Sequence, residues 1–482
     1  MVSLFLNMRN SITYILTLIL AVLLTSACSN TYYENIDRGS GFQFEPGKPE
    51  LRLAASGFIN EENTPQILVT GDIVYASLIY KKRDDDISAV INIEVLVERN
   101  SESGKKTVIS NQQFIETLIR NDRAAVFDQN VFRFERQFDV KPQEYKVTVS
   151  ITDMASGANT TRETTVEIPK IEDNAAEITQ IRTLAKNSSE EDGQFSQVTT
   201  YDIPSQLDSL QFIFQVLKPT SRPMEVESRL IKFNSDKTAA WPMSYQNYPN
   251  SSIQYQGIEY DDFEVIQSSL RNLEVRGNVL IENNFKGLQE GNYRLEVIAK
   301  SDRNEEIIRA RDFGIKSAYY PSLKKPQDLA APLQYLMNDK EFEELTSIND
   351  PDSLKSAIDR FWLSNIGNSS TAKSVISMFY ERVEEANKQF SNFEEGWKTD
   401  PGMVYILFGP PWDFTRYNDR MVWSYSYNLD DPEKNFVFRQ PKLKNKFYPF
   451  YNFILDRSIY LNSLEYKQKE RWLSGSILTR QN

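Results

Sequence analysis

A long succession of short segments in which apolar and polar residues alternate constrains this chain most. Because successive side chains of a strand point to opposite faces of a sheet, each segment is typical of a half-buried strand. Turn-forming residues, such as those at 100–104 (NSESG), separate the segments. Many short strands joined by regular turns predict β-sandwich architecture. The segments are LRLAASGF, DIVYASLIY, AVINIEVLVE, VFRFERQFDV, EYKVTVSIT and RETTVEI within residues 50–170, and LQFIFQVL, MEVESRLIKF, YRLEVIAK and IIRARDFGI within residues 175–318.

The two halves of this strand-rich region share a local pattern. In each half a turn precedes a tyrosine, Tyr145 or Tyr293, which opens an alternating strand. A tyrosine in this place resembles the tyrosine corner of immunoglobulin-like domains, where the hydroxyl bonds to nearby backbone. The resemblance implies two immunoglobulin-like β-sandwich domains, at 50–170 and 175–318. One larger sandwich is the alternative.

The periodicity becomes helical beyond a segment rich in proline and lysine at 317–332. We expect Asp352 or Ser353 to cap a helix that continues through residues 361–363, and a second helix at 371–390. Helices followed by strands predict an α+β domain at 319–482, so the fold class is mixed: two β-sandwich domains, then an α+β domain. The apolar face of the second helix should contain Val375, Met378, Phe379, Val383, Ala386 and Phe390.

A cluster of glycine, proline and aromatic residues follows that helix, reading GWKTDPG from residue 396, then VYILF, GPP and, later, VWSY. We expect Gly396 to end the helix in a left-handed conformation. Asp400-Pro401-Gly402 is expected to form a type II turn. Thr399 and Asp400 carry short oxygen-bearing side chains, and we expect both to bond local backbone amides.

The apolar run at 404–408 is predicted to be a strand that enters a sheet. Gly409 follows it, and Pro410 and Pro411 should end it because neither proline can donate a ladder hydrogen bond. Trp423 and Tyr425 should share one face of a second strand, over the indole of Trp397.

This cluster resembles the GWxTD-domain family, seen in lipoproteins and secreted proteins of Bacteroidota and related phyla. The resemblance covers about residues 360–427, including FW at 361–362, YERV at 380–383 and GWKTD itself. It implies an architecture but no activity. We therefore interpret the motif as fold-forming and assign no catalytic residue. The residues so interpreted are Gly396, Trp397, Thr399, Asp400, Gly402, Gly409, Pro410, Pro411, Trp423 and Tyr425.

An active site at the same place is the alternative to a fold-forming motif. It would use Asp400 with Asp413, and Arg382 or Arg416, around the Gly-Pro-Pro segment. Paired carboxylates can divide acid and base roles if their environments separate their pKa values.

The N-terminus combines an apolar run with the only cysteine of the chain, Cys28. The run at 11–24 is shorter than the roughly 20 apolar residues of a membrane span, and therefore suits a signal peptide. Its end, TSAC, resembles a bacterial lipobox, with Thr25 where leucine is usual. We expect residues 1–28 to be a lipoprotein signal peptide ending at the lipidation site Cys28. An ordinary signal peptide is the alternative, and translation from Met1 or Met8 stays open.

Residues 29–49 are polar and are expected to form a tether between lipid and body. Ser29 is not the aspartate that resembles an inner-membrane retention signal, and NTYYEN at 30–35 lacks the acidic cluster that resembles a surface-export signal. We therefore expect a lipid anchor in the outer membrane and a body in the periplasm. Surface exposure stays open.

The absence of histidine, with the single cysteine acylated, excludes several reaction classes. Ser-His-Asp and Cys-His catalysis, and zinc, copper or iron sites built on imidazole or sulfur, all need residues that the chain lacks. Carboxylate-based hydrolysis, Ser-Lys chemistry and a calcium site with oxygen ligands remain. We assign no metal and no cofactor. A net charge of -12 argues against nucleic acid as a partner.

The sequence thus predicts a binding protein and not an enzyme: an interaction or scaffold subunit of a cell-envelope complex, with envelope proteins as partners. The aromatic segment FYPFYNF at 447–453 carries many large rings, some of which are expected to contact a partner. A glycan-binding protein that uses the ring of Trp397 or Trp412 in an open cleft is one alternative. A carboxylate-based hydrolase is the other.

Overall fold

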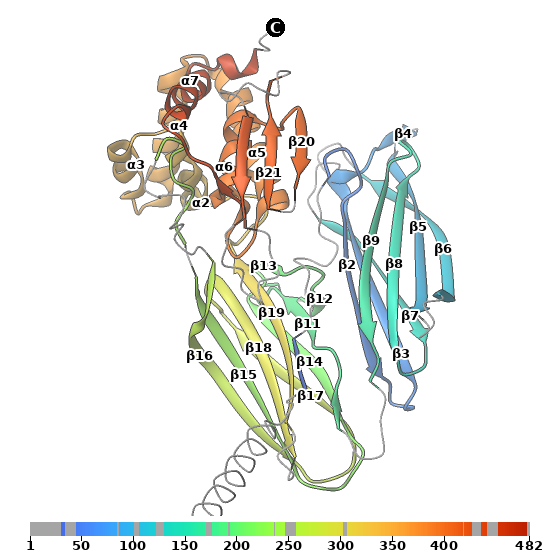
Figure 1. Ribbon diagram of the computed structural model, residues 1–482. Coiled ribbons are helices and arrows are strands. Elements are labelled where there is room, and N and C mark those ends of the chain that lie inside the picture. The colour runs from blue at the N-terminus through green and yellow to red at the C-terminus, as the bar shows by residue number, and fades with distance from the viewer. Residues whose placement is uncertain are drawn as a thin grey trace, which may run out of the picture.

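The fold is mostly β-sheet, in several sheets, with a helical C-terminal region (Figure 1). Among the described residues, no helix is both long and apolar enough to cross a membrane. Cys28 and most of the aromatic segment at 447–453 lie outside these residues. The computed structural model describes residues 30–33, 45–83, 86–100, 106–121, 130–169, 176–190, 193–235, 237–245, 257–301, 306–417, 419–426, 435–440 and 452–479.

The first β unit, residues 45–169, consists of two sheets around one apolar core. One sheet has the order β2-β3-β7, and the other has the order β4-β5-β8-β9, with β6 on the other side of β5. Both sheets contribute side chains to a single buried cluster, among them Leu53, Val69, Ile93 and Val149. Its elements are β2 (Leu51–Ile59), β3 (Pro65–Val74), η1 (Tyr75–Ser77), β4 (Lys81–Arg83), β5 (Asp86–Asn100), β6 (Lys106–Arg120), β7 (Val131–Asp139), β8 (Glu144–Asp153) and β9 (Asn159–Glu167).

The second β unit, residues 176–316 together with the N-terminal strand β1, repeats this two-sheet arrangement around a core of its own. One sheet has the order β10-β14-β11-β12, with β17 also paired to β14. The other has the order β1-β19-β18-β15-β16, with β13 paired to β19. Its strands are β1 (Asn30–Tyr33), β10 (Glu177–Ile178), β11 (Arg182–Lys186), β12 (Ser196–Gln197), β13 (Asp202–Pro204), β14 (Ser209–Lys218), β15 (Met224–Ser235), β16 (Ile258–Leu273), β17 (Gly277–Lys286), β18 (Gly291–Ser301) and β19 (Glu306–Lys316).

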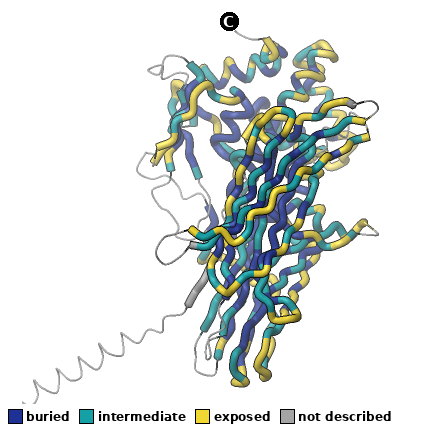
Figure 2. The backbone as a smooth tube through the Cα atoms, turned by 90° about the vertical axis from the view of Figure 1, so that its right-hand side faces the viewer, coloured by how far each residue is buried: buried dark blue, intermediate teal, exposed yellow. Residues whose placement is uncertain are grey.

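All ten predicted strand segments coincide with strands, in whole or in part. Figure 2 shows why the alternation was informative, because buried positions follow more exposed ones along these strands. Three strands of ten residues or more, β6, β16 and β17, were missed. Each is bonded to one neighbour only among the described strands, and most side chains of β6 and β16 are polar and exposed. An edge strand of this kind lacks the apolar half of the pattern.

The two tyrosines behave as the resemblance to a tyrosine corner implies. The Tyr145 hydroxyl donates to the carbonyl oxygen of Lys141 at 2.8 Å. The Tyr293 hydroxyl donates to the carbonyl oxygen of Gln289 at 2.7 Å. In both units the bond reaches back four residues, and both rings are buried. This hydrogen-bond prediction is confirmed.

The C-terminal region, residues 317–479, packs helices against a small sheet with the order β20-β21-β22-β23. Figure 1 shows it at one end of the second β unit, with the first β unit alongside. Its core includes Trp362, Phe379, Ile406, Trp423 and Trp472. Its elements are α2 (Pro326–Ala330), η3 (Ala331–Tyr335), α3 (Asp339–Thr346), α4 (Pro351–Ile366), α5 (Ser369–Phe390), η4 (Gly396–Lys398), α6 (Asp400–Phe408), β20 (Asp413–Arg416), β21 (Arg420–Ser424), β22 (Asn435–Arg439), β23 (Ile454–Leu455), α7 (Leu461–Leu473) and η5 (Ser476–Leu478).

Both predicted helices are present, with one correction at a start. The predicted face of α5 packs into the core, fully buried at Val375 and Phe379 and partly buried at Met378. The cap of α4 is neither Asp352 nor Ser353. Asp350 caps it, because its carboxylate accepts from the Ser353 amide at 2.8 Å and Pro351 takes the first helical position, where no N–H is needed.

Candidate functional site

The GWKTD residues follow α5 and lead into α6, which begins at Asp400, and two predictions about the backbone here are wrong. Residues 404–408 are not a strand, and Asp400-Pro401-Gly402 is not a type II turn, because both belong to helix α6. Thr399 caps this helix: its Oγ1 accepts from the Gly402 amide at 3.1 Å, which confirms its predicted local bond. Eight of the nine residues of α6 are buried, so its sequence shows no polar face, and a short apolar run fits a strand equally well.

Gly396 and Gly402 are needed for space and not for a left-handed turn. Helix α5 ends at Phe390, before Gly396, so the predicted role of Gly396 as helix stop is wrong. A Cβ atom on Gly396 would lie 1.9 Å from the carbonyl oxygen of Ala386, and one on Gly402 would lie 1.8 Å from that of Gly396. The left-handed φ occurs instead at Gly409, where it is 81°.

Trp397 is buried, with 5% of its surface exposed, and its polar groups are bonded inside the protein. Its indole Nε1 donates to Glu395 Oε2 at 2.8 Å, and its amide donates to Asn387 Oδ1 at 3.0 Å. Its carbonyl oxygen accepts from the Tyr335 hydroxyl at 2.8 Å, and the same tyrosine ring meets the indole edge-on. A side chain so enclosed forms a platform for no external ligand.

Trp423 and Tyr425 do not lie over Trp397, so that prediction is wrong. The Trp423 ring packs against those of Phe390, Tyr405 and Phe438. Tyr425 lies just beyond the end of β21, and its hydroxyl donates to the Gly409 carbonyl oxygen at 2.6 Å. The segment Gly409-Pro410-Pro411 follows the end of helix α6 and leads into β20. The prediction that it ends a strand is wrong.

Asp400 bonds distant groups, so the prediction that it bonds local amides is wrong. Its carboxylate accepts from the Leu455 amide at 2.7 Å and from two nitrogens of Arg457, at 2.6 and 2.7 Å. Both side chains of this ion pair are more than nine-tenths buried. The same guanidinium donates to the carbonyl oxygens of Trp241, at 3.1 Å, and Pro242, at 3.2 Å. Asp400 thus positions an arginine that binds a loop of the second β unit.

Residues 391–400, which we call the coupling loop, make further bonds to the second β unit. The Ser317 amide, just after β19, donates to Glu395 Oε1 at 2.9 Å. The Asn292 side chain of β18 donates to the Phe393 carbonyl oxygen at 2.9 Å, and Lys316 Nζ reaches the same oxygen at 3.2 Å. The loop that contains the motif is therefore a joint between two parts of the chain.

A segment of the second β unit, residues 237–245, completes the core of the C-terminal region. Met243 is fully buried among the core residues of that region. Its amide donates to Glu465 Oε2 of α7 at 2.8 Å. The amide of Ala240 donates to the Lys398 carbonyl oxygen, in the coupling loop, at 2.7 Å. The core of the C-terminal region is therefore closed by a segment of the second β unit, which keeps a separate core of its own.

The residues of the alternative active site are not brought together. Asp400 is engaged with Arg457, whereas Asp413 is exposed on β20 and accepts from the Thr415 hydroxyl. Arg382 donates to carbonyl oxygens at the end of α6, and burial lowers its pKa. Arg416 lies over the ring of Phe453. Among the described residues, no group of three or more aspartate, glutamate or cysteine side chains is placed to bind a metal ion.

Two carboxyl groups near Glu395 have a raised pKa. Burial is the main cause at Asp328, and the negative charge of Glu395 adds to it, so that its pKa rises to about 6. Burial and then Glu395 raise the pKa of Glu290 in the same direction. Asp328 also has a buried oxygen without a hydrogen-bond partner in the structure. These acids destabilise the folded state when charged.

Exposed aromatic residues gather at the β20 edge of the C-terminal sheet. Trp412, Phe414 and Tyr417, which we call the aromatic edge, are 67%, 52% and 47% exposed. Phe414 lies opposite the buried Trp423 in the register of β20 and β21, so both point to the same face of the sheet. The apolar face that the helices bury at β21 thus continues, exposed, onto β20, which pairs with β21 alone among the described strands.

Residues 297–474 match the family model of the GWxTD domain. This chain contains a GWxTD domain. The match begins within β18, after Asn292, and covers β19, the helices and the small sheet. The coupling loop, Lys316 and Ser317 therefore lie inside the matched residues, whereas Asn292 and the segment 237–245 lie before them.

Comparisons with curated proteins and with solved structures add little to the match with the GWxTD domain. No curated protein matches the chain. Among solved structures, the crystal structure of red sea bream transglutaminase matches 55% of this chain and 31% of its own chain, with 9% sequence identity and a TM-score of 0.19. The match spans less than a third of that enzyme's chain, and a TM-score this low carries no argument.

Sequence reasoning missed three residues of the GWxTD domain that hold the coupling loop. Asn387 bonds the Trp397 amide, Glu395 bonds the indole, and Arg457 bonds Asp400. Asn387 offered one signal, because it is a polar residue directly after Ala386 of the apolar face of α5; the structure shows that it is fully buried. Arg457 offered none, because it is 57 residues away from Asp400 along the chain.

Proposed function

We propose that this protein is a lipoprotein anchored in the outer membrane that acts as an interaction or scaffold subunit of a cell-envelope complex. It would bind partners and catalyse no reaction. The aromatic edge carries this proposal, because it extends the apolar face of the GWxTD sheet beyond its covering helices. Large exposed apolar patches of this kind are typical of protein contacts, in which tryptophan, tyrosine and phenylalanine are enriched.

The motif itself is proposed to be structural. Gly396, Trp397, Thr399, Asp400 and Gly402 are all buried, and their polar groups bond to other parts of the chain. A joint of this kind would hold the GWxTD domain at a fixed orientation on the second β unit, as a scaffold requires.

Contacts with the first β unit support the same scaffold role. Lys388 of α5 lies 3.3 Å from Glu50 in a buried ion pair. The side-chain oxygen of Gln215 accepts from the Ile59 amide at 2.8 Å, and its nitrogen donates to the Ile59 carbonyl oxygen at 2.6 Å. We propose that the two β units are immunoglobulin-like spacers, a reading that their tyrosine bonds support. They would carry the aromatic edge away from the membrane.

The aromatic edge can be tested with a photo-crosslinking amino acid placed at Trp412 in the full chain, expressed in its native host. The matched control is Leu363, an exposed apolar residue of α4 in the same region. We expect one discrete adduct with an envelope protein from position 412 and none from position 363. Equal labelling from both positions, or no adduct from 412, would contradict a docking role for this edge.

The lipid anchor needs its own test, since Cys28 lies outside the described residues. We expect Cys28→Ser to release the protein from membranes without changing its melting temperature, because the cysteine would serve only as the acylation point. Ser29→Ala is the matched control and should stay with the membranes. A Cys28→Ser protein that still sediments with membranes after a high-salt wash would rule out the lipoprotein assignment.

A further inference from the structure

Strand β1 places the proposed lipid anchor at one end of the second β unit. It pairs in parallel with β19, and Asn30 lies opposite Ile307 in this register. Because the two strands run in the same direction, Asn30 is the residue of β1 nearest the end of the sheet at which β19 begins. Only Ser29 separates Asn30 from Cys28, and two residues span at most about 7 Å. A lipid on Cys28 would therefore hold that end of the second β unit close to the membrane.

Two loops lie at the same end of the sheets, and we call them together the tip: residues 218–224, which join β14 to β15, and residues 273–277, which join β16 to β17. Met224 lies opposite Leu273 of β16 and Ser301 of β18, and β19 begins opposite the last residues of β18. Figure 1 shows this end of the second β unit on the side away from the GWxTD domain. The tip is therefore a part of the protein that the anchor would bring to the membrane.

The tip combines an exposed apolar side chain with positive charge. Val275, in the turn between β16 and β17, is 74% exposed. The Lys218 Nζ donates to the Val275 carbonyl oxygen at 3.4 Å and so holds this turn. Arg222 and Arg276 are exposed, and Glu274 is the one acidic residue of the two loops, although the whole chain has a net charge of -12. An apolar side chain beside arginines suits a lipid surface, whose anionic headgroups cover an apolar interior.

We propose that the tip rests on the membrane that holds Cys28, with Val275 among the lipid headgroups and with Arg222 and Arg276 facing the phosphates of anionic lipids. This inference rests on the lipid anchor of the proposed function and adds an orientation to it. The second contact lies about 19 Å from the first, since β16 is four strands from β1 and neighbouring strands are about 4.8 Å apart. Two contacts at this separation restrict the tilt of the protein, which an acyl anchor alone leaves free.

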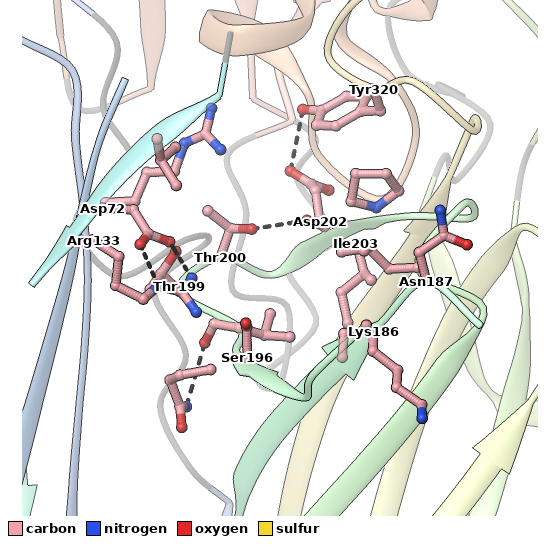
Figure 3. Close-up of a pocket in the computed structure, with 18 of the residues that line it drawn as sticks. Asp72, Arg133, Lys186, Asn187, Ser196, Thr199, Thr200, Asp202, Ile203 and Tyr320 are labelled. Carbon is pink, nitrogen blue, oxygen red and sulfur yellow. Dashed lines mark hydrogen bonds and ion pairs between the residues drawn. The ribbon is translucent and has the colours of Figure 1, made fainter. Parts of the chain in front are cut away.

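Figure 3 shows how the first β unit is fixed to the second, so that both take the same orientation. Asp72 of the first unit accepts two hydrogen bonds from Arg133, both of 2.7 Å, and one from the Thr199 hydroxyl of the second unit at 2.8 Å. Tyr320, beyond β19, donates to Asp202 Oδ2 at 3.2 Å. These groups line a cavity of about 300 Å³ between the units, and their bonds join the two units to each other.

Strand β19 carries this orientation to the GWxTD domain. Its 11 residues span about 33 Å at roughly 3.3 Å per residue, from the end near the tip to the coupling loop. At the far end, Lys316 Nζ reaches the Phe393 carbonyl oxygen at 3.2 Å. The aromatic edge lies beyond that end (Figure 1), so a tip on the membrane would hold this edge clear of the lipid and open to a partner.

The test uses the lipidated full chain, in which an introduced cysteine is the only free thiol because Cys28 is acylated. Val275→Cys is labelled with an environment-sensitive fluorophore and reconstituted into vesicles of phosphatidylethanolamine and phosphatidylglycerol. Val265→Cys is the matched control, because it is 45% exposed on the same strand, eight residues before β16 ends at Leu273. We expect a nitroxide on the lipid headgroups to quench the probe at 275 and not the probe at 265. Aqueous iodide should do the reverse.

The charge requirement is tested on the Val275→Cys protein. Adding Arg222→Gln and Arg276→Gln should lower the docking equilibrium of the tip about fivefold for each arginine, seen as a loss of quenching by the nitroxide. Arg360→Gln, the same change at an exposed arginine of α4, should leave the quenching unchanged. All these variants alter exposed side chains and should melt at the parent temperature.

The outcomes separate the tip from the anchor. Labelled protein that does not float with the vesicles would overturn the lipid anchor and the tip contact together. Protein that floats, but whose probe at 275 stays as open to iodide as the probe at 265, would overturn the tip contact and leave the anchor in place. A probe at 275 that is shielded from iodide yet not quenched by the nitroxide would mean that a second copy of the chain covers the tip, which would overturn the proposal as well.

Discussion

The coupling loop and the aromatic edge belong to the same GWxTD domain, yet they differ in almost every physical respect. Trp397 in the loop is 5% exposed, whereas Trp412 at the edge is 67% exposed. The loop bonds to α5, to the second β unit and to Arg457. The edge extends the apolar face of a sheet into solvent. The residues that are easiest to recognise in the sequence are therefore the least accessible to a partner.

This difference reflects what each region requires of its residues. The coupling loop needs particular side chains, because Gly396 and Gly402 leave no room for a Cβ atom and Asp400 must face Arg457. The aromatic edge needs only large apolar rings on one face of a strand. A sequence motif of particular residues can thus arise from packing constraints, while a contact surface produces a much weaker pattern in the sequence.

Trp397→Ala should have the largest effect on stability. Removing a buried indole leaves a cavity and takes the donor away from Glu395 Oε2, so we expect a loss of about 3–5 kcal/mol in the free energy of unfolding of the GWxTD domain. Urea denaturation followed by tryptophan fluorescence and circular dichroism measures this loss. Trp412→Ala is the matched control and should lose less than about 0.5 kcal/mol. Similar losses in the two variants would remove the contrast between loop and edge.

Asp400 provides the next test, through the buried ion pair with Arg457. Asp400→Ala leaves a buried guanidinium without its counterion, which costs about 3–5 kcal/mol in comparable cases. Asp400→Asn keeps one acceptor for the Leu455 amide but loses the charge, so we expect a smaller loss of about 2 kcal/mol. Thermal and urea melts of both variants give this order.

A catalytic Asp400 would give a different result for the same two variants. The Asn form would then fold as stably as the parent while failing, like the Ala form, to restore function in a deletion strain. Asp413→Asn serves as control, because this carboxylate is exposed on β20 and its loss should change neither stability nor function.

The raised pKa of Asp328 gives a smaller, pH-dependent effect. Its folded-state pKa of about 6 lies above the ordinary value of 3.8, so the folded protein holds this proton more tightly than the unfolded chain. Stability from this group is therefore present below about pH 4 and is lost as the pH rises through 6. Asp328→Asn should match the parent at pH 4 and exceed it at pH 7 by about 1 kcal/mol, since a half-buried group is partly screened by solvent.

Urea midpoints at the two pH values measure the Asp328 effect. Glu290→Gln should shift stability in the same direction, because burial and Glu395 raise the pKa of Glu290 as well. A stability difference between parent and Asp328→Asn that is the same at pH 4 and pH 7 would show that the carboxyl group does not titrate in this window.

Sequence alone predicted ten strand segments, the two tyrosine bonds and helix α5, because each depends on local periodicity or on a bond four residues away. It failed at α6, where burial on all sides removes the helical period, and at β6, β16 and β17, each of which has one strand neighbour among the described residues. These failures share one cause: the deciding contacts come from tertiary neighbours that short-range pattern does not record.

The same limit applies to the candidate site. The sequence singled out Trp397 and Asp400 correctly as unusual, but it assigned them the wrong neighbours. Their partners include Tyr335, 62 residues away, and Arg457, 57 residues away. Met243, which completes the core of the GWxTD domain, belongs to a segment that sequence analysis assigned to a different domain. Only the three-dimensional arrangement identifies the loop as a joint.

The double variant Trp412→Ala/Phe414→Ala should have the smallest effect on stability and a large effect on binding. Both rings are more than half exposed, so their removal exposes no core, and we expect a change below about 1 kcal/mol in the free energy of unfolding. A crosslinking amino acid at Tyr417, which lies three residues after Phe414 and is itself 47% exposed, reports on the partner. We expect its adduct in the parent protein and its loss in the double variant. If these rings instead belonged to the folded core, the variant would lose several kcal/mol, as Trp397→Ala should, and the adduct would vanish only because the domain unfolds. A variant that keeps both its melting temperature and its adduct would mean that the partner binds elsewhere, and the contrast between a buried joint and an exposed docking edge would then fail at the edge.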